Sequence, residues 1–210
     1  IYIMKPAYSV LFRWTVLLHL FGMCCTHAVD WDGGGDATTW GCGCNWSNNS
    51  VPGNGTNVFF DCGSPASATV CLGAICNGTN TFRVECQACG NYTFQKGTIR
   101  ATSSAQFNDG TATFNCGGNF TTTGSNNIWL ATAAADTGTV NISGGTICVG
   151  GNLEVGRSGN GTLVITNGAT VNADFIVLGQ SNSGSGTIIM CNGTLDATGD
   201  QLKMSNCSNE

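Results

Sequence analysis

Three carboxylates near the start of the chain have the spacing of a metal-binding loop. Asp30, Asp32 and Asp36 fall within seven residues that also contain three glycines. Carboxylate oxygens on a glycine-rich turn are ligands that Ca²⁺ prefers, so the run suggests a calcium site. The EF-hand pattern fails because no Glu stands at its twelfth position, and Asx turns account for the same residues without a metal. Calcium is therefore the one cofactor that the sequence suggests.

Three tryptophans in the same opening segment offer a second kind of site. Trp31, Trp40 and Trp46 each combine a broad apolar ring with a polar N–H, a combination that can stack on sugar rings. The competing interpretation places the same rings over the apolar end of a stacked repeat, which needs a cap. The first interpretation predicts an extracellular glycan as partner, and the second predicts a structural role.

The other chemistry-bearing residues argue against an enzyme. The only two histidines, His19 and His27, lie in a segment that we expect to be removed. A mature chain without imidazole cannot use Ser-His-Asp or Cys-His catalysis. Its carboxylates are scattered, and the nearest approach to a catalytic group is Asp196 and Asp200 close to Lys203. We predict a protein without catalytic residues.

The first 28 residues have the features of a secretory signal peptide. Lys5 precedes a mostly apolar stretch over 10–25, and a small-x-small cleavage pattern ends at Ala28. A membrane anchor is the alternative, but the stretch is shorter than the ~20 apolar residues that span a bilayer and is interrupted by Arg13 and His19. We predict export to an extracellular or cell-surface location, with no stable membrane span.

Composition narrows the fold class and the partners. Only 9% of the residues are charged, against about 25% in an ordinary globular domain. Gly, Thr and Asn make up 79 of the 210 residues, and these residue types favour turns and strands, so the composition excludes a helical protein. The net charge is −5, and removal of the signal leaves five basic side chains against twelve acidic ones. Such a surface does not attract nucleic acid.

Cysteines and glycosylation motifs agree with an exported protein. Thirteen cysteines, eight of them within 42–116, predict structural disulfides, and the eleven that follow the signal leave one thiol unpaired or bonded to another chain. Asn-x-Ser/Thr motifs are more frequent than chance predicts, although a strand repeat rich in Asn-Gly-Thr also generates them. The ten candidate glycosylation sites are Asn45, Asn48, Asn54, Asn77, Asn91, Asn119, Asn141, Asn160, Asn192 and Asn206.

A repeat in the last third of the chain predicts the fold. Segments that begin with Gly-Thr and a short apolar strand start at Gly138, Gly161 and Gly186, and a weaker copy starts at Gly110. A unit of about 24 residues cannot bury its own apolar side chains, but stacked turns bury them in a shared lumen. We expect Val140 and Ile142, with their counterparts in later turns, to fill that lumen. Gly144, Gly145, Gly168 and Gly193 are expected at corners that need left-handed backbone angles.

The opening segment adds a family resemblance. It contains a Trp-x-Gly-Gly-Gly run at 31–35, an Asn-Trp-Ser triplet at 45–47, Pro52 and the apolar strand 57–60. This order, followed by Gly/Thr/Asn-rich repeats, resembles bacterial surface proteins of the autotransporter-passenger kind. The resemblance implies the first coil of a secreted β-helix and a role on the cell surface, and it brings no catalytic residues. The many cysteines depart from that family, whose members mostly lack them.

These observations predict a right-handed parallel β-helix of ~23–28-residue coils with a disulfide-rich N-terminal cap, and a β-sandwich is the alternative fold. The expected divisions are the signal peptide 1–28, the cap and first coils 29–96, and the repeats 97–210. The predicted function is a secreted or cell-surface structural or adhesive glycoprotein, such as a subunit of a fibre or coat. Its predicted partner is a second copy, stacked head to tail. The alternative function is a carbohydrate-binding module of the cell wall or matrix.

Overall fold

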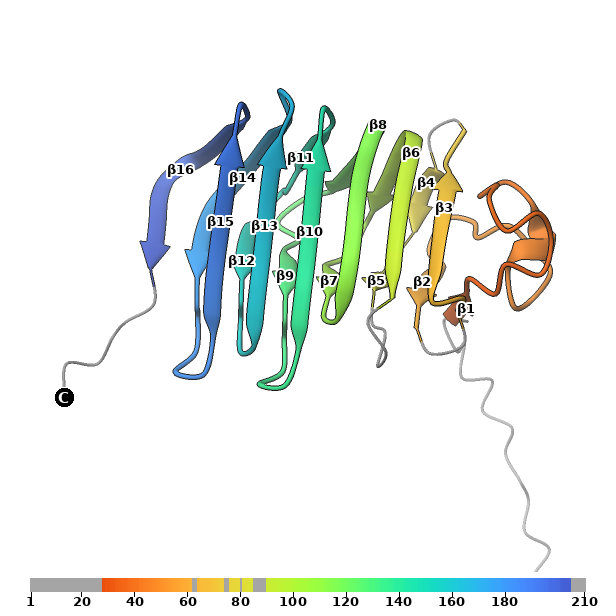
Figure 1. The fold of residues 1–210 in the computed structure, drawn as a ribbon, viewed down its shortest axis with the longest axis horizontal. Helices are drawn as coiled ribbons and strands as arrows, with labels where there is room; N and C mark the ends of the chain where they lie inside the picture. The colour runs from red at the N-terminus through yellow and green to blue at the C-terminus, as the bar shows by residue number, and fades with distance from the viewer. Residues whose placement is uncertain (1–27, 62–63, 74–75, 80, 85–89, 205–210) are drawn as a thin grey trace, which may run out of the picture.

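The chain folds as a parallel β-solenoid of about six turns (Figure 1). The computed structural model describes residues 28–61, 64–73, 76–79, 81–84 and 90–204. Every strand pair in these ranges is parallel, and the strands between the two ends pair with strands of the turns before and after their own. The predicted fold class is confirmed over the β-sandwich, which would pair its strands mostly antiparallel. The predicted signal peptide lies outside the described residues, except for Ala28, which begins the first strand.

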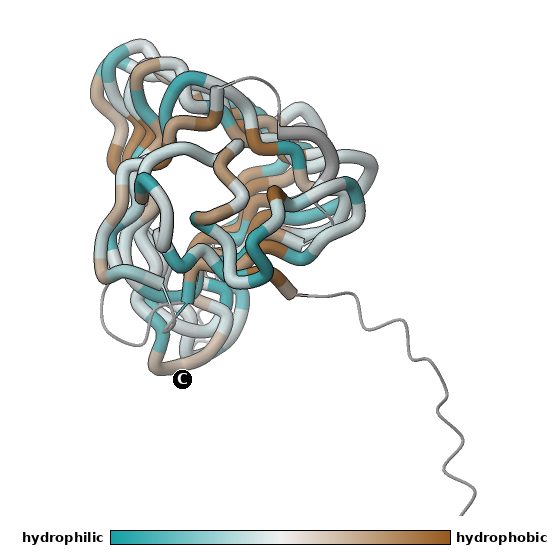
Figure 2. Tube along the Cα trace, turned by 90° about the vertical axis from the view of Figure 1, so that its right-hand side faces the viewer, coloured by the Kyte–Doolittle hydropathy of each residue, from teal (hydrophilic) through white to brown (hydrophobic). Residues whose placement is uncertain are grey.

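Each turn contributes strands to three faces, which give the solenoid a three-sided outline when it is viewed along its axis (Figure 2). Four long strands bend from one face to the next. Face A consists of β3 (Ser67–Cys71), the first parts of β6 (Asn91–Ala101) and β8 (Gly110–Thr122), β10 (Thr137–Ser143), β13 (Asn160–Thr166) and β15 (Ser185–Cys191). Face B consists of β4 (Cys76–Thr79), the second parts of β6 and β8, β11 (Thr146–Cys148), and the first parts of β14 (Thr170–Leu178) and β16 (Thr194–Met204). Face C consists of β1 (Ala28–Asp30), β2 (Asn57–Phe60), β5 (Phe82–Val84), β7 (Ala105–Phe107), β9 (Ile128–Leu130), β12 (Asn152–Val155) and the second parts of β14 and β16.

The register of face A is the one that the repeat predicts. Gly138 pairs with Gly161, and Gly161 pairs with Gly186, so the repeated segments stack in phase. The weaker copy at Gly110 pairs with Gly138 in the same column. The solenoid begins closer to the N-terminus than the repeated motif does, because β6 already bends across faces A and B. The expected boundary between residues 96 and 97 therefore falls inside a strand of a continuous stack.

The lumen changes character along the axis. Near the N-terminal end it holds phenylalanines whose ring centroids lie 5.1 to 5.7 Å apart, as Phe82, Phe94, Phe114 and Phe120 show. Later turns fill the same space with aliphatic side chains. The fully buried members there include Val140, Ile142, Leu153, Val155, Leu163, Ile165 and Val171. The predicted lumen residues are thus confirmed for the turns of β10 and β13.

The corner between faces A and B contains a column of left-handed residues. Gly144 and Gly168 have φ values of +68° and +73°, as predicted. Asn167 and Asn192 also have left-handed φ values, which Asn tolerates better than most residues. Gly145 and Gly193 are glycine for another reason, since their φ values are not positive. A Cβ atom at Gly145 would collide with the carbonyl oxygen of Gly118.

Gly138 lies where two segments of the backbone approach each other closely. A Cβ atom there would overlap the backbone carbonyl oxygen of Phe107, which lies on the preceding turn. Because that carbonyl belongs to a paired strand, we expect Gly138→Ala to lower the free energy of unfolding by roughly 2 to 4 kcal/mol, as measured by urea denaturation. Gly41→Ala is the control, because Gly41 is exposed and open space surrounds the added carbon. Equal losses in the two variants would contradict the close-approach explanation.

Candidate functional site

The N-terminal end of the lumen is closed by a cap that spans residues 31–56 and includes the short 3-10 helix η1 (Gly43–Asn45). The ring centroids of Trp31 and Trp46 lie 5.8 and 6.1 Å from that of Phe60, and Trp40 lies 4.7 Å from Trp46. The Trp46 indole N–H also donates to the Trp40 carbonyl oxygen at 2.9 Å. All three tryptophans are at most 3% exposed. The predicted cap is confirmed, and within it the three rings face the lumen and one another rather than an accessible surface where a glycan could stack.

Two of the three aspartates of the opening segment form turns, and Asp30 ends strand β1. Asp32 Oδ1 accepts the Gly34 N–H at 2.9 Å, and Asp36 Oδ1 accepts the Thr38 and Thr39 N–H groups. Hydrogen bonds from the Thr39 side chain and then from Asn45 hold the pKa of Asp36 well below its usual range. Burial, and secondarily the nearby Asp61 and Asp32, raises the pKa of Asp30. The described residues contain no group of three or more metal-ligating side chains, so the predicted calcium site is not assembled.

Asn45 joins the strands of the cap. Its Oδ1 accepts the N–H groups of Gly35 and Ala37 at 3.0 and 2.9 Å. Its Nδ2 donates to Asp36 Oδ1 at 2.7 Å and to the Thr39 carbonyl oxygen at 3.0 Å. The side chain is fully buried. Both amide hydrogens of Asn45 are donated within the cap, so among the predicted glycosylation sites this asparagine is the one that the fold buries.

The remaining predicted glycosylation sites differ in access. Asn119 and Asn141 are half-buried, Asn206 lies outside the described residues, and the Asn77 side chain is likewise not described. The exposed sites are Asn48, Asn54, Asn91, Asn160 and Asn192.

The cysteines of the described part form no disulfide. The cap cysteines Cys42 and Cys44 are free, as are Cys71, Cys116, Cys148 and Cys191. The predicted disulfide-rich cap is thus not what holds the described cap together, because its contacts are the indole cluster and the Asn45 hydrogen bonds. The other cysteines after residue 28 lie where side chains are not described.

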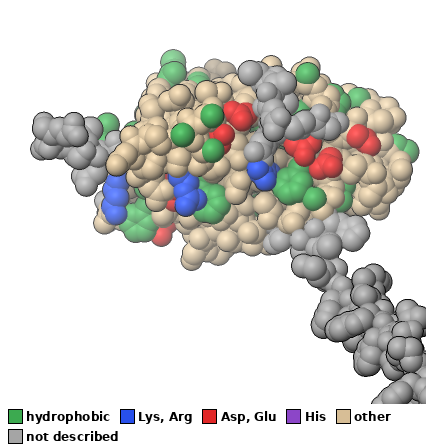
Figure 3. Space-filling view, turned by 90° about the horizontal axis from the view of Figure 1, so that it is seen from below, with side chains coloured by type: hydrophobic (Ala, Val, Ile, Leu, Met, Phe, Trp, Pro, Cys, Tyr) green, Lys and Arg blue, Asp and Glu red, His purple; other side chains and the backbone are tan. Residues whose placement is uncertain are grey.

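Face C carries most of the basic side chains of the described part. Arg83, Arg157 and Lys203, three of the five, lie in or directly after its strands. Figure 3 shows basic side chains with hydrophobic groups beside them on the face seen from below. Each of the three lies over an aromatic ring, at 5.9 Å from the Phe59 centroid, 4.4 Å from the Trp129 centroid and 5.9 Å from the Phe175 centroid, respectively. Such contacts hold the cations in place and cover the rings.

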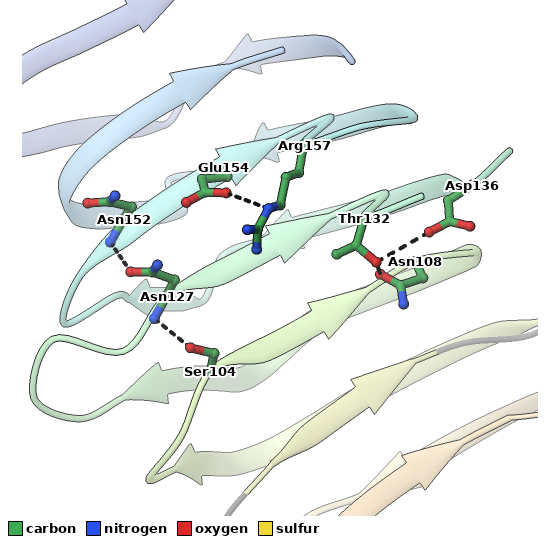
Figure 4. A network of polar contacts seen from close by, with 8 residues as sticks. All are labelled: Ser104, Asn108, Asn127, Thr132, Asp136, Asn152, Glu154 and Arg157. Carbon is green, nitrogen blue, oxygen red and sulfur yellow. Dashed lines mark hydrogen bonds and ion pairs between the residues drawn. The ribbon is translucent and has the colours of Figure 1, made fainter. Parts of the chain in front are cut away.

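Trp129 is the functional candidate that sequence reasoning missed. It lies between Ile128 and Leu130, and both neighbours are buried. Strict alternation in this short strand places the indole on the outer surface, and this signal was available from the sequence. Beside it, Arg157 Nε lies 3.4 Å from Oε2 of Glu154, which is 3% exposed (Figure 4). Burial raises the pKa of Glu154, and Arg157 partly offsets that effect.

A polar ladder positions the strands of this face. The backbone N–H of Asn152 donates to Asn127 Oδ1 at 2.8 Å, and the N–H of Asn127 donates to Ser104 Oγ at 3.2 Å (Figure 4). Each side chain therefore ties the start of one rung to the next. At the other end of the strands, the Thr132 hydroxyl donates to Asn108 Oδ1 at 2.8 Å and lies 3.5 Å from Asp136 Oδ2. The two networks keep the rungs in register.

The C-terminal end of the described solenoid is open. The last rung consists of β15 and β16, which pair with β13 and β14 on one side only. Met190, Leu202 and Met204 stand in lumen columns, yet they are 54%, 59% and 75% exposed. The outward Ile189 is 52% exposed. Thus four of the five exposed large hydrophobic side chains of the described part belong to this single rung.

Two further features accompany the open rung. A shallow hollow of about 170 Å³ lies at its corner between faces C and A, and is lined by residues that include Leu178, Ser185 and Met204. Asp196 lies on face B and Lys203 on face C, both exposed and facing outward. The structure therefore places two members of the suggested group, Asp196 and Lys203, on different faces, and the side chain of the third, Asp200, lies outside the described part.

The comparisons with known proteins do not assign the chain to a family. No protein-family model, curated protein or solved structure matches the chain. The resemblance to autotransporter passengers therefore rests on the opening motif and on the solenoid architecture alone. No helix among the described residues is long and apolar enough to span a membrane.

Removal of the Asn45 side chain should open the cap. Asn45→Ala leaves the backbone N–H groups of Gly35 and Ala37 without partners and removes a donor to the Asp36 carboxylate, and we expect a loss of roughly 2 to 4 kcal/mol in the free energy of unfolding. Urea unfolding followed by tryptophan fluorescence measures it, because the cap holds three indoles. Asn48→Ala is the control, since the exposed Asn48 accepts only the Ser50 N–H. A similar loss in both variants would argue against a special role for Asn45.

Glu154 should make stability depend on pH. A carboxyl whose pKa is raised by folding binds its proton more tightly in the native state, so its contribution to stability is lost as the pH rises above its ordinary pKa of 4.5. Glu154→Gln removes this dependence. We expect the stability of the variant relative to wild type to increase from about pH 4 to about pH 7 in urea unfolding. A constant difference across this range would contradict the raised pKa.

Proposed function

We propose that this chain is an extracellular structural or adhesive protein that associates with other copies through its open last rung. The observation that carries the proposal is that Met190, Leu202 and Met204, all more than half exposed, lie together on one rung whose outer edge is unpaired. Lumen side chains in every earlier turn are covered by the next turn. A strand edge with apolar side chains beside it is a template for pairing with another chain.

Other features support a structural role outside the cell. The signal-like segment 1–28 and the many Asn-x-Ser/Thr motifs favour export and glycosylation. Five of the motif asparagines are exposed, two in the cap and three on the solenoid, where a glycan can be accommodated. The rungs are joined by parallel strand pairs and polar ladders, so the molecule is suited to present a stiff surface.

Carbohydrate binding remains the alternative function, on other residues than the cap tryptophans. The specific observation in its favour is on face C, where half-exposed Phe59, Trp129 and Phe175 each lie beside a basic side chain. Aromatic rings beside charged and amide groups are suited to sugar contacts. Arg157 lies over the Trp129 ring, however, so a sugar would have to displace it or use the ring edge. We therefore rank this function second.

The proposal predicts self-association that depends on the last rung. Met190→Lys should weaken association at least about tenfold, because it places a strongly hydrated charge in the apolar contact. Light scattering coupled to size-exclusion chromatography measures the mass over a range of concentrations. Val51→Lys is the matched control, because Val51 is also exposed, at 41%, but lies in the cap at the other end. If both variants weaken association equally, the open rung is not the contact.

A further inference from the structure

The self-association proposed above, on which this inference rests, has a specific geometry. We infer that the open rung pairs with the open rung of a second copy, tail to tail, about a twofold axis perpendicular to the solenoid. In this arrangement the edges of β15 and β16 pair antiparallel with the same edges of the second copy. The contact is self-complementary, as a twofold interface must be. This contact uses the open edge of both copies, so it produces a dimer rather than a longer chain of molecules.

The cap leaves the other end of the molecule unsuited to head-to-tail stacking. On face A, Thr39 forms a bridge with Cys71 of β3, and the Trp40 N–H donates to the Cys71 carbonyl oxygen at 3.1 Å. On face C, the Ser47 N–H donates to the Asp30 carbonyl oxygen of β1 at 2.9 Å. Cap residues thus already use edge groups that an incoming rung would need. The predicted head-to-tail stack therefore has an open tail but lacks a matching open head.

The last rung can pair with itself without exposing its apolar side chains. A twofold axis through the centre of β15 places Ile188 opposite Ile188 of the second copy. It also places the first part of β16, on face B, opposite the second part of β16 of the second copy, on face C. Leu195 and Ala197 then face Met204 and Leu202 of the second copy, and all four positions point toward the lumen. The two lumens become one continuous apolar core.

The same register brings opposite charges together. Asp196 lies between Leu195 and Ala197, and Lys203 lies between Leu202 and Met204, so both side chains project outward. Pairing that matches the apolar positions places Asp196 opposite Lys203 of the second copy. The twofold axis repeats this contact on the other side, which gives two opposite-charge pairs per dimer. Directly opposite charges favour one register and one orientation over others.

A second copy offers strands of matching length to the edge of the last described rung, on all three faces. Antiparallel addition to a parallel edge is common in mixed sheets.

A charge exchange tests the register. Asp196→Lys and Lys203→Asp, each alone, place like charges opposite one another twice per dimer and should each weaken dimerisation at least about tenfold. The double variant, with both exchanges, restores opposite pairs and should return to within about threefold of wild type. Light scattering over a dilution series gives the masses, and circular dichroism verifies that each variant is folded. Lys96→Asp, an exposed reversal on an earlier turn, should leave dimerisation unchanged.

The outcomes separate this inference from the proposed function. A wild-type dimer, single variants that dissociate and a double variant that recovers support the tail-to-tail contact. A double variant as weak as the single variants overturns the register. Fibres that lengthen with concentration, seen by negative-stain electron microscopy, overturn the tail-to-tail geometry but agree with self-association. A wild-type protein that remains monomeric at all concentrations overturns both.

Discussion

The structure depends on one constraint, which is that no turn of this chain can bury its own apolar side chains. A turn of two or three short strands has one inward row per face, and that row is covered only when another turn lies on each side. When one turn stacks on another, the parallel strand pairs form and the lumen side chains are buried in the same step. The glycine column at 110, 138, 161 and 186, the left-handed corner residues and the Asn127 ladder all serve this contact. Each allows two turns to approach to sheet distance while their polar groups stay paired.

The same constraint explains which parts of the fold could be predicted from the sequence. The turns of β10, β13 and β15 repeat a motif in phase, so both their register and their lumen residues were predictable. The turns of β3 and β6 obey the same geometry without the motif, because buried aromatic side chains such as Phe94 fill the lumen there. Their sequence does not resemble the later repeats, and so only the three-dimensional stack reveals that they belong to it. Corner glycines were located correctly, but Gly145 serves close approach rather than a left-handed angle.

The candidate site was harder to predict, because it depends on how faces and ends are arranged. The cap tryptophans attract attention in the sequence, but a ring that covers a lumen and a ring that binds a sugar have the same local pattern. Cysteine density suggested disulfides, whereas the described cap is held by indole packing and one buried amide. Asp196 and Lys203 are close in sequence, yet the bend within β16 sends them to different faces. Their role emerges only when two ends are placed against each other.

The gradient of side-chain size along the lumen has a mechanical consequence. Aromatic rings interlock at the capped end, whereas smaller aliphatic groups stack toward the open end, and the last rung has a neighbour on one side only. In a linear array each unit leaves with the loss of a single interface, so a rod of this kind opens from its weaker terminus. Tension applied along the axis would peel the solenoid one coil at a time from β16 toward the tryptophan cluster.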